Sequence, residues 1–285
     1  MVKKINTERG NFSYRIFGKT TCPVLMLVHG WPQSSYCWIE VSKYLTDYFV
    51  IAPDLRGLGD SERNDEVDKF TKDQLALDLF AIADTLGLEE FYLGGHDWGG
   101  AVVQEMALLQ PQRIKKLIIL NMMLIHNAEG KKKAAQTLGK QMFRSSWYQF
   151  FQSIPGFAEK MIEGKEDIWI RFFCRGISSP IPEEAIQEYI RCYKIDGTIT
   201  SGANLYRSLP TDRLRWKTYH KNTLLMPSLI IHGELDPVII KDFLFKADSV
   251  FSNLKIKYLK AGHFIGDEQP KKVGNAINTF LKEER

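Results

Sequence analysis

The stretch Phe91-Tyr92-Leu93-Gly94-Gly95-His96-Asp97-Trp98-Gly99-Gly100 decides the fold, because it joins a strand to a helix through a tight turn. Phe91 to Leu93 is expected to be a strand that breaks at Gly94-Gly95, and Gly100 to Leu109 has helical spacing. Small residues two positions before and after Asp97 allow backbones to approach closely. The pattern predicts a nucleophile elbow, which pushes its apex residue into a cleft at the helix N-terminus.

The apex of this turn is Asp97, a carboxylate where a serine is more familiar. A carboxylate is already a nucleophile at neutral pH and suits displacement at a saturated, electrophilic carbon, which leaves an ester on the enzyme. Water must then hydrolyse that ester, so the site also needs a base. Alternatively, Asp97 is only a helix N-cap, and a short motif standing alone favours that structural interpretation.

Two later segments supply an acid and a histidine at the ends of strands. The buried run Ile230-Ile231-His232-Gly233-Glu234-Leu235-Asp236-Pro237 ends in an acidic residue, and Ala261-Gly262-His263-Phe264 follows the next strand. Nucleophile, acid and histidine occur in the chain order that folds with this elbow use. We expect His263 to activate the hydrolytic water as a general base and Asp236 to orient the His263 ring. Each segment alone has a structural interpretation, but their combination favours catalysis.

A fourth motif, His29-Gly30-Trp31-Pro32, follows the buried strand Val24 to Val28. This architecture carries an oxyanion-hole loop at that position, so the backbone N–H groups of Trp31 and Trp98 are expected to stabilise a tetrahedral intermediate. We interpret His29 itself as a structural histidine that holds the loop.

The order of elements along the chain predicts an α/β fold with a mostly parallel central sheet flanked by helices. Between Asn121 and about Thr223 the chain is rich in aromatic residues with helical spacing, and no buried strand run interrupts it. We therefore predict an α/β core made of residues 1–124 and 222–285, with a helical cap inserted as residues 125–221. Strands are expected at residues 12–17, 24–28, 48–52, 91–93, 114–120, 228–231 and 255–259, and core helices at 72–86, 100–109 and 271–281.

The composition is that of a soluble globular protein: the 285 residues are 44% hydrophobic and 25% charged. Disordered, collagen-like and coiled-coil classes are excluded on these values. The 38 Lys and Arg residues exceed the 34 Asp and Glu residues by 4, and they are scattered, so no nucleic-acid partner is expected. The one tight basic run, Lys131 to Lys133, indicates a solvated loop.

The cysteines and the N-terminus bear on the compartment. The four cysteines show no CxxC pair and no Cys/His metal spacing, so we expect reduced thiols, no metal and no cofactor. Met1-Val2-Lys3-Lys4 runs directly into polar residues, which does not look like a secretory segment. The apolar runs are strand-sized, and no membrane span is expected. These features predict a cytoplasmic protein, a monomer or a homodimer.

With these motifs the chain resembles α/β-hydrolases of the soluble epoxide hydrolase subfamily over nearly its full length. The resemblance implies two cap tyrosines that donate to the epoxide oxygen, and Tyr148 and Tyr206 lie in matching segments. A phenol is neutral at pH 7 and donates well to a developing alkoxide. The implied reaction converts a small apolar epoxide and water to a vicinal diol, with an ester on Asp97 as the intermediate. Trp98, Trp147 and Phe151 are expected to contact the substrate.

Other activities use the same core motifs. Haloalkane dehalogenases share the Asp nucleophile but bind halide with nitrogen donors, of which Trp98 could be one. Their second donor is commonly an Asn directly after the His-Gly pair, where this chain has Trp31. Trp147 or Trp169 could replace that donor. Fluoroacetate dehalogenases carry arginines just after the nucleophile, where this chain has Trp98 and Ala101. A serine esterase is disfavoured by the Asp apex. A non-catalytic binding protein remains a third alternative, because a fold alone does not prove activity.

Overall fold

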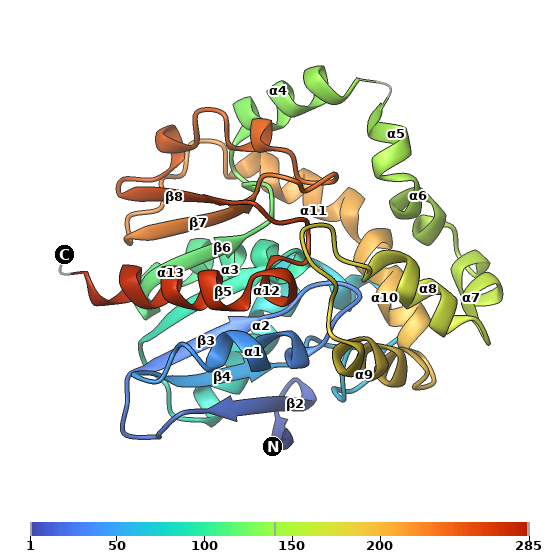
Figure 1. The fold of residues 1–285 in the computed structure, drawn as a ribbon, viewed down its shortest axis with the longest axis horizontal. Coiled ribbons are helices and arrows are strands. Elements are labelled where there is room, and N and C mark those ends of the chain that lie inside the picture. Colours follow the sequence, from blue (N-terminus) through green and yellow to red (C-terminus); the bar gives the residue numbers. More distant parts are fainter. Residues whose placement is uncertain (1, 140, 284–285) are drawn as a thin grey trace.

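The computed structural model of the protein describes residues 2–139 and 141–283, and it is built on one eight-stranded sheet. The strand order is β1-β2-β4-β3-β5-β6-β7-β8 (Figure 1). The first two pairings, β1 with β2 and β2 with β4, are antiparallel, and every later pairing is parallel. The strands are β1 (Val2–Thr7), β2 (Gly10–Phe17), β3 (Val24–Val28), β4 (Phe49–Pro53), β5 (Phe91–His96), β6 (Ile114–Leu120), β7 (Ser228–Gly233) and β8 (Leu254–Leu259). The predicted α/β class is confirmed.

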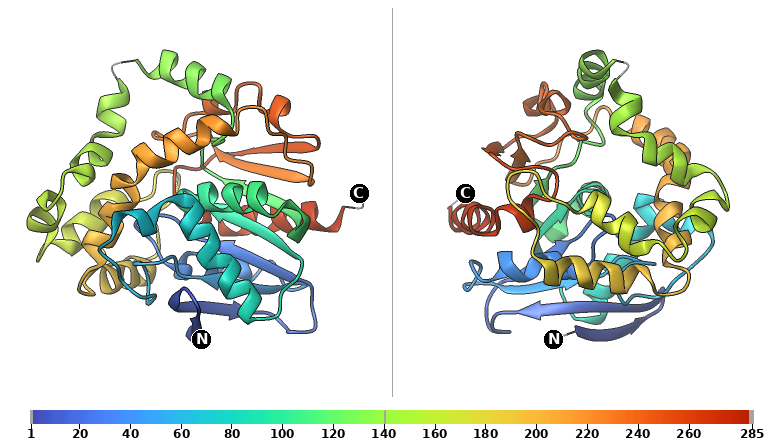
Figure 2. Two further views of the ribbon diagram at one scale, coloured as in Figure 1. Left: turned by 180° about the vertical axis from the view of Figure 1, so that it is seen from behind. Right: turned by 45° about the vertical axis from the view of Figure 1, so that its right-hand side comes forward.

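Helices cover both faces of the sheet, as parallel strands require. One face carries α1 (Ile39–Ser42), α12 (Ile265–Glu268) and α13 (Pro270–Lys282), and the other carries α2 (Lys72–Thr85) and α3 (Trp98–Leu109) (Figures 1 and 2). Short 3-10 helices occur at η1 (Ser35–Trp38), η2 (Val67–Phe70), η3 (Pro111–Arg113), η4 (Lys241–Leu244) and η5 (Ala247–Val250).

The chain between β6 and β7 is helical wherever the structure describes regular elements in it, and these helices lie together at one end of the sheet (Figure 1). We call this helical insertion the cap. Its side chains share one hydrophobic core with the sheet, since Tyr189 and Trp216 of the cap are as fully buried as Leu27 and Ile118 of the strands. The proposed division at residues 125 and 221 stays a prediction. The cap helices are α4 (Ala128–Leu138), α5 (Gln141–Ser145), α6 (Trp147–Ser153), α7 (Phe157–Ile162), α8 (Glu166–Phe173), α9 (Glu183–Tyr193), α10 (Thr198–Arg207) and α11 (Leu209–Thr218).

Two local expectations were wrong, and one strand was missed. β5 does not break at Gly94-Gly95, because both glycines pair with β3 on one side and β6 on the other; the chain turns only at Asp97, and α3 begins at Trp98. The strand β1 was not expected, since its mostly exposed, lysine-containing sequence has no apolar run. The run Lys131 to Lys133 lies within helix α4 and not in a loop.

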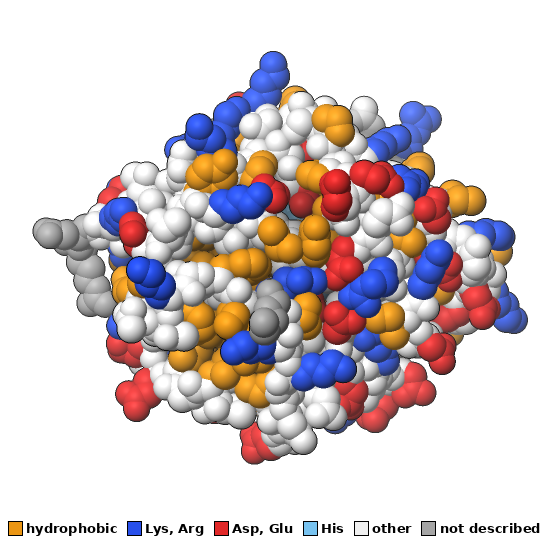
Figure 3. Space-filling model, turned by 60° about the horizontal axis from the view of Figure 1, so that its bottom comes forward, with side chains coloured by type: hydrophobic (Ala, Val, Ile, Leu, Met, Phe, Trp, Pro, Cys, Tyr) orange, Lys and Arg blue, Asp and Glu red, His pale blue; other side chains and the backbone are white. Residues whose placement is uncertain are grey.

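The N-terminal edge of the sheet is open but polar. Lys3 and Lys4 of the edge strand β1 are exposed. On the side of the molecule turned forward in Figure 3, Lys and Arg side chains are interspersed with Asp and Glu around exposed hydrophobic groups. Charged residues on an edge strand oppose its pairing with another chain. Separately, none of the helices in the described ranges combines the length and the apolar character that crossing a bilayer would require.

Candidate active site

The turn between β5 and α3 holds Asp97 in a conformation that few side chains adopt. Its backbone angles are φ 50° and ψ −126°, and its side chain makes no capping hydrogen bond to the helix it precedes. The neighbouring glycines are required for space: a Cβ on Gly99 would lie 2.4 Å from the carbonyl oxygens of Val28 and His29. Strain of this kind persists only when the surroundings enforce it, and it is concentrated at functional sites. The arrangement argues against a simple N-cap.

Asp97, His263 and Asp236 come together at the ends of β5, β8 and β7. His263 Nε2 lies 3.3 Å from Asp97 Oδ2, and His263 Nδ1 lies 2.7 Å from Asp236 Oδ2. The other oxygen of Asp236 accepts hydrogen bonds from the backbone N–H groups of Val238 and Ile239, at 2.8 and 3.0 Å. Asp236 is thereby fixed, and it holds the imidazole ring with its second nitrogen directed at Asp97.

The charges of this group stabilise one another. Burial opposes the charged form of His263, but the Asp236 and Asp97 carboxylates outweigh it and raise the pKa of His263 to about 10. Burial likewise raises the pKa of Asp97, but the hydrogen bond and positive charge of His263 outweigh that and bring it below its ordinary value. The two carboxyl groups therefore favour the imidazolium form of His263 at neutral pH.

The loop that carries His263 is held by residues that the sequence did not single out. Asn121, at the end of β6 with φ 41°, donates to the carbonyl oxygens of Gly262 and His263, each at 2.8 Å, and accepts from Gly233 N–H at 2.7 Å. His96 Nε2 lies 2.7 Å from the same His263 carbonyl oxygen. The signal in the sequence that could have identified Asn121 is its position, since it is a polar residue directly after a buried strand. Asn121 links the histidine loop to the end of the strand that precedes the acid.

Two backbone N–H groups face the Asp97 carboxylate, as the expected oxyanion hole requires. The Trp31 N–H donates to Asp97 Oδ1 at 2.8 Å, and the Trp98 N–H also contributes to the low pKa of Asp97. His29 has the structural role we expected: it is fully buried, its Nδ1 lies 2.9 Å from the Gly30 carbonyl oxygen, and its Nε2 accepts from the Leu55 N–H at 3.0 Å.

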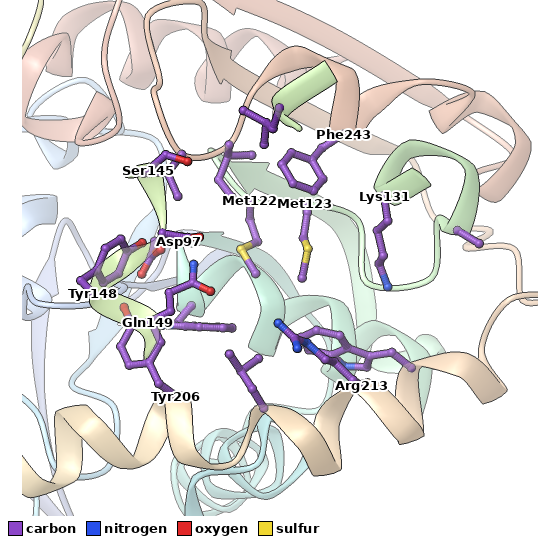
Figure 4. A pocket seen from close by; sticks show the side chains of 18 of the residues that line it. Asp97, Met122, Met123, Lys131, Ser145, Tyr148, Gln149, Tyr206, Arg213 and Phe243 are labelled. Carbon is purple, nitrogen blue, oxygen red and sulfur yellow. The ribbon is translucent and has the colours of Figure 1, made fainter. Parts of the chain in front are cut away.

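Tyr148 and Tyr206 lie on cap helices α6 and α10 and line the same cavity as Asp97. Their ring centroids are 5.7 Å apart with planes 84° apart, and Figure 4 shows both hydroxyls turned toward Asp97. Burial, and to a lesser degree the Asp97 carboxylate, raises the pKa of each phenol above its ordinary value. Both tyrosines are therefore neutral donors. The Trp31 ring stacks on Tyr148 with centroids 5.5 Å apart, which ties the oxyanion loop to the cap.

Two cavities meet at Asp97. The larger has a volume of about 490 Å³ and the smaller about 250 Å³, and Tyr148 lines both. His263 and Trp147 line the smaller one, whereas Trp98 lines the larger. Further apolar side chains line the larger cavity without having been singled out from the sequence: Met122, Met123, Leu138, Leu209, Val238, Ile239 and Phe243.

Phe151 is placed differently from the expectation that it contacts substrate. It does not line either of these two cavities; its ring packs against Phe157 and Trp169, with centroids 5.1 and 5.2 Å apart. Aromatic side chains at helical spacing within a small cap are needed first for the interior of the cap, and Phe151 serves that interior.

Comparisons with known proteins agree with this geometry. A family model described as the alpha/beta hydrolase fold matches residues 23–270. The chain is 30% identical to Epoxide hydrolase 4 of Mus musculus, over 96% of this chain and 77% of that protein. It is 31% identical to the soluble epoxide hydrolase of Corynebacterium sp. (strain C12), over 90% and 88%. The solved structure of epoxide hydrolase CorEH without ligand superposes with a TM-score of 0.83, at 28% identity, over 99% and 98% of the two chains.

The chain belongs to the α/β-hydrolase superfamily and, within it, to the epoxide hydrolase subfamily. The fold and these relatives support a hydrolase as the general class of activity.

Proposed function

We propose that the protein is an epoxide hydrolase that forms a vicinal diol through an ester on Asp97. The observation that carries this proposal is the position of the Asp97 carboxylate, which contacts His263 on one side and shares a cavity with two buried phenols on the other. A nucleophile alone would suit several displacements. Tyr148 and Tyr206 favour an epoxide, because its oxygen leaves the attacked carbon, stays bonded to the other ring carbon and must accept a proton.

In the first step, an Asp97 oxygen attacks one ring carbon and the carbon–oxygen bond of the epoxide breaks. Tyr148 or Tyr206 donates its proton to the oxygen as negative charge develops there. Forming the ester removes the negative charge of Asp97, so His263 loses one of the two carboxylates that raise its pKa. The proton that His263 then releases balances the proton given up by the tyrosine.

In the second step, neutral His263 takes a proton from water, and the hydroxide attacks the ester carbonyl. The N–H groups of Trp31 and Trp98 stabilise the resulting oxyanion, while Asp236 stabilises the imidazolium. Collapse expels the diol oxygen, which takes a proton from His263. The new carboxylic acid of Asp97 returns its proton to the histidine, which restores the resting site. No group other than those of the chain, the epoxide and water takes part.

One observation keeps haloalkane dehalogenation as a second candidate. The indole N–H of Trp98 is buried in the cavity that Asp97 lines, next to the Tyr206 phenol, where it is placed to donate to a leaving halide. That reaction needs the same nucleophile and base but no phenol proton.

Replacing His263 with Gln tests the proposal, because it stops hydrolysis of the ester without removing the nucleophile. We expect mass spectrometry to show the whole mass of an epoxide added to the peptide that contains Asp97. With a haloalkane, dehalogenation would instead add only the alkyl group and release halide.

The Asp97→Asn variant is the control, and it should form neither adduct. Absence of any adduct across a panel of epoxides and haloalkanes, with small apolar ligands still bound, would contradict the proposal and favour a non-catalytic binding protein.

A further inference from the structure

The larger cavity has two chemically different ends. One end is the site at Asp97, and the other is lined by Lys131 of α4 together with Arg213 and Lys217 of α11. Figure 4 shows Lys131 and Arg213 reaching toward the cavity on the side away from Tyr148. Apolar side chains line the space between, so a ligand that filled the cavity would be apolar in its middle.

Helix α11 places two exposed positive residues at the rim of the cavity. Arg213, Trp216 and Lys217 are three and four positions apart, so they share one face of the helix, and that face lines the cavity. Leu214 points the other way and is 66% exposed. An ordinary surface helix directs its apolar residues to the interior and its charges to water. Accordingly, Trp216 is buried whereas Arg213 and Lys217 are exposed, which places these two charges at the mouth of the cavity that they line.

The positive residues that line the cavity lack the carboxylate partners that a neighbour on α11 has. Arg215 of the same helix lies 3.2 Å from Asp73 and 3.6 Å from Glu105. In the part of the chain that the structure describes, by contrast, no Asp or Glu is within ion-pairing distance of Lys131, Arg213 or Lys217. A cavity that gathers unpaired charges of one sign is favourable for a ligand of the opposite sign.

Lys131 is held in place as a binding group would be. Its ammonium group donates to the Ile125 carbonyl oxygen at 2.5 Å and lies 5.2 Å from the centre of the Trp216 ring. Burial, with a smaller contribution from the positive charge of Arg213, lowers the pKa of Lys131 to about 8. The free protein therefore holds this charge at an energetic cost, which a bound anion would relieve.

We propose that Lys131, Arg213 and Lys217 form an anion-binding subsite for the terminal carboxylate or phosphate of an amphipathic substrate whose reactive group lies at Asp97. An arginine fork and lysine ammonium groups suit both anions. The identity of the reactive group rests on the proposed epoxide hydrolase function. The anion subsite itself does not, and the two are separable by experiment.

Binding of three unreactive ten-carbon probes tests the subsite directly. Decanoate and decyl phosphate carry the anion, decan-1-ol does not, and the fluorescence of Trp98 and Trp216 in the cavity reports all three. We expect at least one anion to bind about tenfold more tightly than the alcohol. Whichever of decanoate and decyl phosphate binds more tightly identifies the preferred headgroup. Equal affinities for all three probes would overturn the proposal.

Variants of the three positive residues test whether these residues cause the preference for anions. The triple variant K131M/R213Q/K217M should lose the preference for anions while its affinity for decan-1-ol is unchanged. The double variant R213Q/K217M changes only the two exposed residues and leaves half-buried Lys131 in place, so it should lose part of the preference for anions. It keeps the test valid if the triple variant misfolds. Lys132→Met is the matched control, because Lys132 is exposed on the same helix α4 and does not line the cavity. A preference that survives in the triple variant would place the anion elsewhere.

Turnover separates the two proposals. We expect kcat/KM for 9,10-epoxydecanoate to exceed that for its methyl ester in the native protein, and the two to be equal in the triple variant. Equal hydrolysis of both by the native protein would overturn the subsite and leave the epoxide hydrolase proposal standing. Anion-selective binding without hydrolysis of either compound would support the subsite and contradict the epoxide hydrolase proposal.

Discussion

The chemistry of single residues in this site depends on the charges placed around them. His263 has an ordinary pKa near neutrality as a free side chain, yet between two carboxylates it is raised to about 10. Asp236 contributes more to that increase than Asp97 does. A base that is protonated at rest can act only once the nucleophile has lost its charge, which orders the two steps of the proposed reaction.

Neutralising either carboxylate should lower the pKa of His263. We expect Asp97→Asn to bring it below 10, and Asp236→Asn to bring it lower still, because Asp236 is in direct hydrogen-bond contact at 2.7 Å. NMR titration of labelled imidazole nitrogens measures both values. His126, whose pKa burial lowers to about 4, is the internal control. A larger decrease in Asp97→Asn than in Asp236→Asn would contradict the larger contribution of Asp236.

The two cap tyrosines should affect only the first chemical step. Tyr148→Phe and Tyr206→Phe are each expected to slow ester formation by about 10- to 100-fold, and the double variant by more, because a positioned acid contributes on the order of 10²–10⁴. Single-turnover rates of adduct formation measure this. Tyr92→Phe, on β5 against Tyr48, is the control and should react normally. An effect on ester hydrolysis alone would assign the phenols to another role.

At the scale of elements, the site is a junction where the ends of several strands meet the N-terminus of helix α3. The N-terminus of α3 lies so close to the end of β3 that no side-chain atom fits between them at Gly99. The same closeness brings the Trp31 N–H to the Asp97 carboxylate. Because the atoms in contact here belong to two backbones, they have little freedom to move apart, so the junction leaves no room for a side chain at Gly99.

Gly99→Ala should therefore destabilise the protein. We expect its free energy of unfolding to fall by about 2 kcal/mol or more, because the new Cβ would meet two carbonyl oxygens at 2.4 Å. Urea unfolding measures the change. Gly266→Ala, in α12, is the matched control: its nearest neighbours would be at 3.7 Å, and the change should be within about 0.5 kcal/mol. Equal stability of the two variants would show that the junction can relax.

At the scale of the whole molecule, buried hydrogen bonds and a buried ion pair join the core to the cap. Asp267 of α12 accepts hydrogen bonds from Gln33 of the core and from Tyr189 of cap helix α9, at 2.5 and 3.0 Å. Burial raises the pKa of Asp267 to about 7. Lys72 of α2 makes a second tie: it forms a fully buried ion pair with Asp212 of α11 at 2.9 Å and donates to the Leu205 carbonyl oxygen. The cap is thus docked through ionisable groups as well as apolar contacts.

The elevated pKa of Asp267 gives the stability a specific pH dependence. In the unfolded chain this carboxyl ionises near pH 4, but in the fold it stays protonated to about pH 7. Its contribution is therefore fully present below pH 4 and is lost as the pH rises to 7, by about 4 kcal/mol at most. Asp267→Asn should remove that part of the slope. Urea unfolding at pH 5, 6, 7 and 8 tests this, and a difference between the two proteins that does not vary with pH would contradict it.

The sequence by itself determined the fold class and the candidate triad, because both depend on local signals. Apolar runs mark buried strands, and the glycines around Asp97 mark a turn that few other sequences can make. The carboxyl ends of parallel strands meet at one edge, so polar residues there, such as Asp236 and His263, could be expected to meet.

Only the tertiary structure decided which cap side chains face the cavity. Phe151 packs inside the cap, Lys131 turns inward from a run that looked solvated, and Asn121 holds the histidine loop across three strands. The physical reason is range: a strand or an elbow is fixed by neighbours in sequence, whereas the face that a cap helix presents depends on the packing of elements far apart in the chain.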